Sequence, residues 1–346
     1  MVILSHARFP LLSIYPRLSA LSIFGFLGVE LFFVLSGFLI GGIILRSFGD
    51  SPGRKNLKSF WIRRWFRTLP NYYLFLLVNW LFFPANGHSL RASSSYLLFL
   101  QNLAWPAPSF FNESWSLAIE EWFYLVFPIL LVAASKIRRE KRFAVAASLG
   151  ALFLFSTLAR FAAVGIWNPS FDAGVRKVVV FRFDALMLGV LAAFVRAYRP
   201  AAWIRLRGAG LAAGTLFGSV VAWSYYALDR DTSLFSRTLL FTLASLSVFC
   251  FLPWLDSWES AEGPAARAVR NISLWSYSLY LCNIPVQHVL TKVFGDPRLA
   301  GAPLSLMKPQ ALAAAFVGLS ILLSALCYRY FEKPAMNLRD RFSASG

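Results

Sequence analysis

The chain has 346 residues, of which 58% are hydrophobic, 17% are aromatic and only 14% are charged. A soluble domain is apolar over about half of its residues and charged over about a quarter, so this composition excludes an ordinary soluble domain and indicates an integral membrane protein. Its 34 Lys and Arg against 16 Asp and Glu give a formal charge of +18. Because these basic residues lie mostly between apolar runs, they indicate membrane topology and not a nucleic-acid partner.

The first long apolar run, Phe24 to Leu45, has 22 positions with Glu30 as its only charge. A helix of that length rises 1.5 Å per residue and crosses about 30 Å of hydrocarbon. An acid in lipid is unfavourable by about 2.5 to 3.5 kcal/mol, so Glu30 is expected to face a protein interior or a wet cavity. Two interpretations stay open: a structural carboxylate satisfied by a neighbouring helix, or a member of a polar pathway through the bundle.

Apolar runs and charged connectors alternate along the rest of the chain, and a stub from Met1 to Phe9 resembles the tail of a first helix. The pattern predicts an all-α polytopic transmembrane bundle of about ten helices, the first one truncated, in one domain over residues 1–346. The nine complete spans are expected at Phe24–Leu45, Asn71–Phe83, Trp122–Ala134, Phe143–Val164, Asp184–Tyr198, Gly208–Tyr226, Arg237–Leu255, Ile272–Val293 and Ala311–Tyr330.

Three connectors, within residues 46–67, 136–142 and 196–207, are rich in Arg and Lys. The positive-inside rule assigns them to the cytoplasm, and each successive pair is separated by two spans, which agrees with that assignment. We therefore expect the C-terminal tail to be cytoplasmic too, in a protein of the bacterial inner (cell) membrane, and we expect no cleavable signal sequence. The connectors between them are poorer in positive charge and carry His88 with Arg91, Arg176 with Lys177, and Arg230.

Two features near the N-terminus carry candidate chemistry. His6 is one of three histidines; it is either a structural residue near a helix end or a general base, since imidazole takes up a proton near neutral pH. Arg63, Arg64 and Arg67 come just before an apolar span, and Arg63 and Arg67 are expected to share a helix face. They are either topogenic or a cytoplasmic phosphate clamp, since guanidinium binds phosphate bidentately.

A second polar stripe opens the span near residue 122. Trp115, Ser116, Glu120 and Tyr124 are spaced to stay close on one helical face. Trp and Tyr alone are typical of an interfacial belt, and a Glu at a helix start also suits the helix dipole. The carboxylate together with its hydrogen-bonding neighbours favours a buried site.

These segments, in this order, resemble the acyltransferase-3 family of integral membrane acyltransferases, which modify sugars, glycans and some macrolides. The resemblance covers nearly the whole chain and rests on seven segments. They are Leu4 to His6, Gly28 to Ile40, Phe60 to Pro70, Trp115 to Tyr124, Arg182 to Gly189, Ile272 to Leu281 and Tyr330 to Pro334.

The resemblance implies transfer of an acyl group, commonly acetyl, from cytoplasmic acyl-CoA to a hydroxyl of a carbohydrate or glycan. It implies that His6 is the general base and that Arg63, Arg64 and Arg67 serve the donor. We expect Glu30 or Glu120 to orient the imidazole. Acyl-CoA is then a co-substrate and no bound cofactor is expected, and the scattered Cys250, Cys282 and Cys327 form no metal site or disulfide framework. The residues expected to shape the acceptor site are Trp115, Ser116, Tyr124, Asp184, Tyr277, Tyr280, Asn283 and Glu332.

Two departures from the family pattern stand out. The family pairs its histidine with an Arg about ten residues earlier, a position that here would precede Met1, which leads us to expect a truncated start. Cys282-Asn283 stands where the family often has a histidine. Two alternatives therefore remain open beside the enzyme: a multi-span exporter of a lipid-linked sugar or metabolite, which acids in spans and a basic inner face would also suit, and an inactive truncated relative.

Overall fold

The computed structural model describes residues 1–48, 53–82, 90–108, 110–258, 262–295 and 308–343. These residues fold into helices and connecting turns, and no strand occurs in those ranges. The expected all-α membrane bundle is confirmed. His88 lies outside the described residues.

Each of the nine expected spans coincides with a helix over its described residues, usually one longer than the apolar run that predicted it; Phe83, the last residue of the second span, lies outside the described residues. The long helices are α2 (Ser22–Ser47), α3 (Arg54–Phe82), α5 (Ser114–Ile137), α6 (Lys141–Trp167), α7 (Phe183–Tyr198), α8 (Pro200–Ala227), α10 (Leu239–Leu255), α11 (Pro264–Phe294) and α12 (Pro309–Cys327). The shorter elements are α1 (Val2–Ala7), η1 (Phe9–Leu11), η2 (Pro16–Leu21), α4 (Leu90–Leu97), η3 (Phe171–Arg176), η4 (Val179–Phe181), α9 (Leu234–Arg237), η5 (Tyr328–Glu332) and α13 (Lys333–Ser343).

Four helical stretches in the described part of the chain are long and apolar enough to cross a membrane: Pro16–Ser47, Ser114–Ile137, Lys141–Trp167 and Pro309–Arg339. The other long helices are less apolar or shorter than these four, because they begin in basic connectors or have few residues. For example, α3 carries Arg63, Arg64 and Arg67 in its first half, and α7 has only 16 residues. The protein is therefore an integral membrane protein whose helices extend past the apolar runs.

Local sequence signals explain where several helices begin and end. Proline occupies the first position of α8, α11 and α12, where its missing N–H has no intrahelical partner to lose. Gly263 precedes α11 with a φ of 106°, which glycine adopts without steric strain. Asn168 ends α6 in the left-handed region, at φ 47°.

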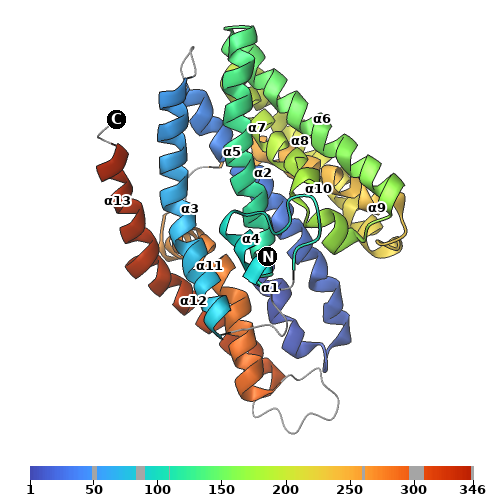
Figure 1. Cartoon of the computed structure of the whole chain (residues 1–346). Helices are drawn as coiled ribbons and strands as arrows, with labels where there is room; N and C mark the ends of the chain where they lie inside the picture. The colour runs from blue at the N-terminus through green and yellow to red at the C-terminus, as the bar shows by residue number, and fades with distance from the viewer. Residues whose placement is uncertain (49–52, 83–89, 109, 259–261, 296–307, 344–346) are drawn as a thin grey trace.

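Helices α2 and α5 run through the centre of the bundle (Figure 1). On one side α3 packs with α11 and α13, and α11 packs with α12; on the other side α7 packs with α6, α8 and α10. Glycines bring α2 and α7 into contact, because a Cβ on Gly37 would lie 2.0 Å from the Leu186 carbonyl oxygen and one on Gly189 would lie 2.1 Å from the Val34 oxygen. Such close backbone approach is typical of membrane helix pairs.

The three basic connectors meet at one end of the bundle, as their spacing predicts. Lys141 Nζ donates to the Leu45 carbonyl at 2.5 Å. The Arg142 guanidinium lies 4.8 Å from the centre of the Tyr198 ring. These two contacts join the connectors that follow α2, α5 and α7, so all three lie on one side of the protein.

We predict that Gly37→Ala destabilises the bundle, because the new methyl group would meet the α7 backbone and overpacking of this kind raises the energy of the folded state by about 1 to 3 kcal/mol. Thermal unfolding of the purified protein in detergent measures this as a lower Tm. Gly150→Ala in α6 is the matched control, since its Cβ would meet nothing within 4 Å. It is expected to leave Tm unchanged or to raise it. Equal effects of the two substitutions would contradict the close α2–α7 contact.

Candidate active site

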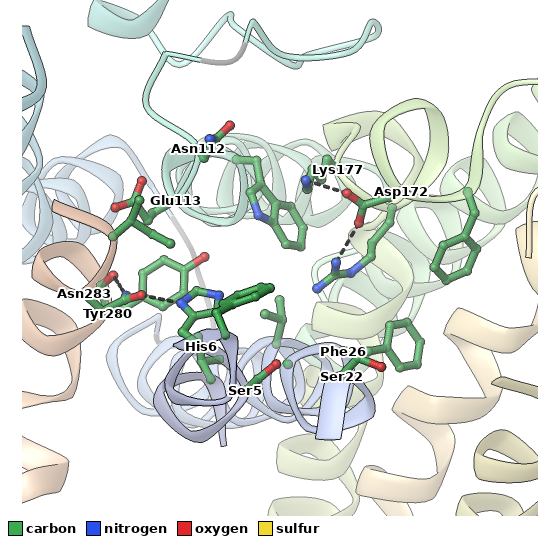
Figure 2. Close-up of a pocket in the computed structure, with 18 of the residues that line it drawn as sticks. Ser5, His6, Ser22, Phe26, Asn112, Glu113, Asp172, Lys177, Tyr280 and Asn283 are labelled. Carbon is green, nitrogen blue, oxygen red and sulfur yellow. Dashed lines mark hydrogen bonds and ion pairs between the residues drawn. The ribbon is translucent and has the colours of Figure 1, made fainter. Parts of the chain in front are cut away.

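A pocket of about 510 Å³ opens at the end of the bundle away from the basic connectors. Its walls come from α1, the first turns of α2 and α5, the η3 segment, the end of α8 and the middle of α11. Figure 2 shows His6 at its base, Glu113 toward α11, and Asp172 with Lys177 across from them. The pocket thus unites residues from both ends of the chain.

His6 is held by Asn283, and this contact sets its tautomer. His6 Nδ1 lies 2.6 Å from Asn283 Oδ1. Asn283 Nδ2 donates to the backbone carbonyl oxygens of Tyr280 and Leu279. Because the amide nitrogen is used in this way, the amide oxygen faces the imidazole and must accept from Nδ1–H. The neutral ring then carries its lone pair on Nε2, which is the form that a general base needs.

A cationic wall stands opposite α11. Asp172 accepts from Arg176 at 2.7 Å and lies 2.5 Å from Lys177 Nζ. Burial acts to raise the pKa of Asp172, but the two cations outweigh it and hold that pKa below its usual value. The Arg176 guanidinium also lies 5.0 Å from the centre of the Trp115 ring. This wall therefore has a charged rim over an aromatic surface.

The polar stripe of α5 is confirmed as a buried set, but its members face different neighbours. Ser116 Oγ lies 2.7 Å from Tyr280 OH, at the level of the pocket floor. Glu120 and Tyr124 lie one and two turns further along α5; Tyr124 OH donates to Glu120 at 3.0 Å and lies 2.9 Å from Ser36 Oγ. The stripe thus leads from the pocket into the interior of the bundle.

The arginine cluster meets the inner end of this stripe. Arg64 and Arg67 interact electrostatically with Glu120, and Trp61 Nε1 donates to the Tyr124 carbonyl at 2.9 Å. Arg63 and Arg67, four residues apart in α3, are both exposed, and Arg64 is partly buried. Within the cluster, Arg64 and Arg67 are the two that act on Glu120.

Glu30 and Asp184 lie in ion pairs apart from His6. Both Glu30 oxygens accept from Arg182 Nη2, at 2.6 and 2.7 Å, and Ser245 donates to the same carboxylate at 2.9 Å. Asp184 accepts from Arg160 at 3.0 Å. Asn283, and neither Glu30 nor Glu120, therefore occupies the position on the imidazole that we expected of a carboxylate. A direct catalytic role for Glu30 stays a prediction.

Tyr277 and Glu332 lie at the packing of α3 with α11 and η5. Tyr277 OH donates to the Thr68 carbonyl at 2.7 Å. Glu332 accepts from Ser278 at 2.6 Å and from Asn71 at 2.9 Å. Neither lines the pocket, so the structure gives them a place in helix packing, next to the inner end of the α5 stripe.

Several residues of the pocket were not predicted as site residues from the sequence. The most prominent are Glu113, Asp172 and Arg176. A usable signal was present: Arg176 and Lys177 lie in a connector that the positive-inside rule expects to be poor in cations. For Glu113 the signal is an acid placed directly before a span. Among the described residues no group of three or more His, Cys, Asp or Glu is arranged to hold a metal ion.

Comparison with known proteins identifies the family of the chain. The profile of an acyltransferase domain family, acyltransferase-3, matches residues 1–329, so the chain belongs to this family of membrane acyltransferases. It is 28% identical over 340 residues, or 90% of its length, to a Bacillus subtilis protein named as the peptidoglycan O-acetyltransferase YrhL, covering 50% of that protein. It is 36% identical over 128 residues, 32% of this chain and 20% of the relative, to the peptidoglycan O-acetyltransferase OatA of Listeria monocytogenes.

The chain thus spans half of the first of these relatives and a fifth of the second. No solved structure gave a significant match. Family membership and the apolar helices identify a membrane protein of the acyltransferase-3 family.

We predict that Asn283→Ala lowers kcat at least tenfold, equivalent to about 1.4 kcal/mol in the barrier, because the imidazole loses the partner that fixes its tautomer. Acetyl transfer by equal amounts of purified variants is the measurement. Gln287→Ala, one turn further along α11, is the control and is expected to keep its activity. Unchanged kcat in Asn283→Ala would remove this residue from the orientation of His6.

Proposed function

We propose that this protein transfers an acetyl group from cytoplasmic acyl-CoA to a hydroxyl of a glycan on the other side of the membrane. One observation carries the proposal: α5 connects two polar sites at different depths. Glu113 belongs to the pocket of His6, and Glu120 meets Arg64 and Arg67. Seven residues of helix separate the two acids, a rise of about 10 Å.

The basic end of the bundle supports the orientation of the two sites. With the three basic connectors in the cytoplasm of a bacterial cell, Arg64 and Arg67 face the compartment that supplies acyl-CoA. The C-terminus is then cytoplasmic. The His6 pocket opens on the opposite side, where a cell-envelope glycan would enter. The peptidoglycan O-acetyltransferase names of the relatives support a glycan acceptor.

In the proposed reaction, His6 Nε2 accepts the proton of the acceptor hydroxyl as the oxygen attacks the thioester carbonyl. The new C–O bond forms an ester, the C–S bond breaks, and the imidazolium returns the proton to the departing CoA thiolate. Asn283 keeps Nδ1–H in place throughout. Tyr280 OH, at the pocket floor beside Ser116, is a donor available to the carbonyl oxygen that becomes negative in the transition state. The reaction needs no cofactor besides its co-substrate.

Proteoliposomes test this function. Purified protein is given acetyl-labelled acetyl-CoA on one side and chitotetraose or peptidoglycan fragments on the other. We expect labelled ester on the glycan and an equal amount of free CoA, and we expect both to be lost in His6→Ala although that variant remains folded. Movement of a glycan without release of CoA would instead identify an exporter and reject the enzyme.

The arginine cluster gives a second, sharper test. Replacing Arg64 and Arg67 with Gln is expected to raise the acetyl-CoA KM at least tenfold while the acceptor KM stays constant, because each charge-assisted bond to phosphate contributes about 1.5 to 3 kcal/mol. Arg63→Gln removes one charge from the same connector, but Arg63 is not one of the two arginines that act on Glu120, so the donor KM of this variant is expected to change little. If all three arginines only direct topology, Arg63→Gln and the double variant will leave donor KM equally unchanged, with cysteine labelling of the connector reporting the topology.

A further inference from the structure

Glu113 is a buried acid without a partner. It directly precedes α5, is 5% exposed, and lines the pocket together with His6. Among the described residues, neither of its carboxylate oxygens has a hydrogen-bond partner. It also makes no side-chain cap on the helix that follows it. Burial of a carboxyl group is unfavourable unless the group forms a hydrogen bond or an ion pair. A ligand in the pocket that pairs with Glu113 would remove this unfavourable energy.

The other acids of the pocket already have partners. Asp172 forms ion pairs with both Arg176 and Lys177. Asp231 accepts from the Phe171 N–H at 2.8 Å. Glu113 lies on the opposite side, near Tyr280 and Asn283 of α11 (Figure 2), and interacts electrostatically with Tyr280. It is therefore the acid on the His6 side of the pocket that a bound molecule can reach.

We propose that Glu113 binds the glycan acceptor, through a neutral hydroxyl or acetamido group next to the hydroxyl that reacts. This inference rests on the proposed function and deepens it, since it assigns a binding residue and a chemical class of acceptor. A sugar that presents such a group to Glu113 would place its reacting hydroxyl toward His6.

The chemistry of Glu113 favours a neutral partner. Burial raises its pKa to about 8, so near neutral pH the empty site holds mainly the protonated acid. A protonated carboxyl group has one O–H donor and one free acceptor oxygen. A sugar hydroxyl or acetamido group also offers both a donor and an acceptor, and the two groups can pair reciprocally. A cationic amino sugar would instead require the ionised carboxylate.

This reasoning makes glutamine an expected substitute, because its amide also offers a donor and an acceptor without charge. Alanine offers neither. Binding is therefore expected to survive Glu113→Gln and to fail in Glu113→Ala. A cationic partner would be lost equally in both variants.

Binding is measured apart from turnover, in the purified full chain carrying His6→Ala, by titration calorimetry with chitotetraose, cellotetraose and fully de-N-acetylated chitotetraose. Chitotetraose tests the acetamido group, cellotetraose tests hydroxyls alone, and the de-N-acetylated sugar tests a cation. We expect Glu113→Ala to weaken the Kd of one of the two neutral sugars at least tenfold and Glu113→Gln to change it less than threefold. Asp229→Asn, an exposed change in the loop after α8 that can still accept the backbone N–H groups of residues 231 and 232, is the control and should match the parent.

Three results would overturn the inference: no binding of either neutral sugar by the parent, equal binding by parent and Glu113→Ala, or equal loss in the Gln and Ala variants. Failure of the proposed function is a separate outcome. It would appear as a chain that binds the sugar through Glu113 but releases no CoA and forms no ester in proteoliposomes.

Discussion

Four buried charges behind the pocket hold the bundle together. The carboxylates of Glu30 and Asp184 and the guanidinium groups of Arg160 and Arg182 are all 0% exposed, and they balance one another. Arg182 also reaches Asp184, with 3.8 Å between Nε and Oδ1. A single charge would be strongly unfavourable in the interior of a membrane bundle, so each one holds its helix in the register that brings it a partner. The set joins α2, α6 and α7.

This charge network also shapes the pocket. Arg182 Nη1 donates to the Arg176 carbonyl at 3.3 Å, which ties the network to the cationic wall. Glu30 directly follows Val29 and lies one turn after Phe26, and both of these line the pocket. Loss of Glu30 would leave Arg160 and Arg182 to share the single carboxylate of Asp184, and would release this wall. An inactive Glu30 variant would therefore not show whether Glu30 is catalytic or structural. Asn283 contacts the imidazole itself, so loss of activity in an Asn283 variant reports on the orientation of His6.

The fold was largely predictable because a membrane allows few solutions. Apolar runs such as Phe24–Leu45 must form helices, since no water is present to satisfy the backbone, and the described residues of all nine runs did so. The charge at Arg160, within the run Phe143–Val164, could also have been recognised as needing a partner. The partner, Asp184, follows from no local pattern, because it depends on how α6 and α7 pack.

The site was harder to predict for the same reason. His6 and Asn283 are 277 positions apart, and no periodicity relates them. The α5 stripe was found because its spacing lies within one helix. The members of the stripe have different partners: Tyr124 donates to Glu120 of the same helix, while Ser116 is hydrogen-bonded to Tyr280 of α11. A pattern within one helix thus predicts a shared face, and packing decides which neighbour each side chain meets.

The depth of the two sites constrains the donor in the proposed reaction. A donor bound at Arg64 and Arg67 lies near the level of Glu120. Its acyl group must nevertheless react beside His6, above the hydrogen bond between Ser116 and Tyr280. Successive turns of α5 rise about 5.4 Å each, so a compact donor bound at the arginines would stop about two turns short. A donor whose charged head stays at the arginines while a narrow arm carries the thioester past Ser116 meets this requirement. Acyl-CoA has this form, which is why the geometry of one helix supports it as co-substrate.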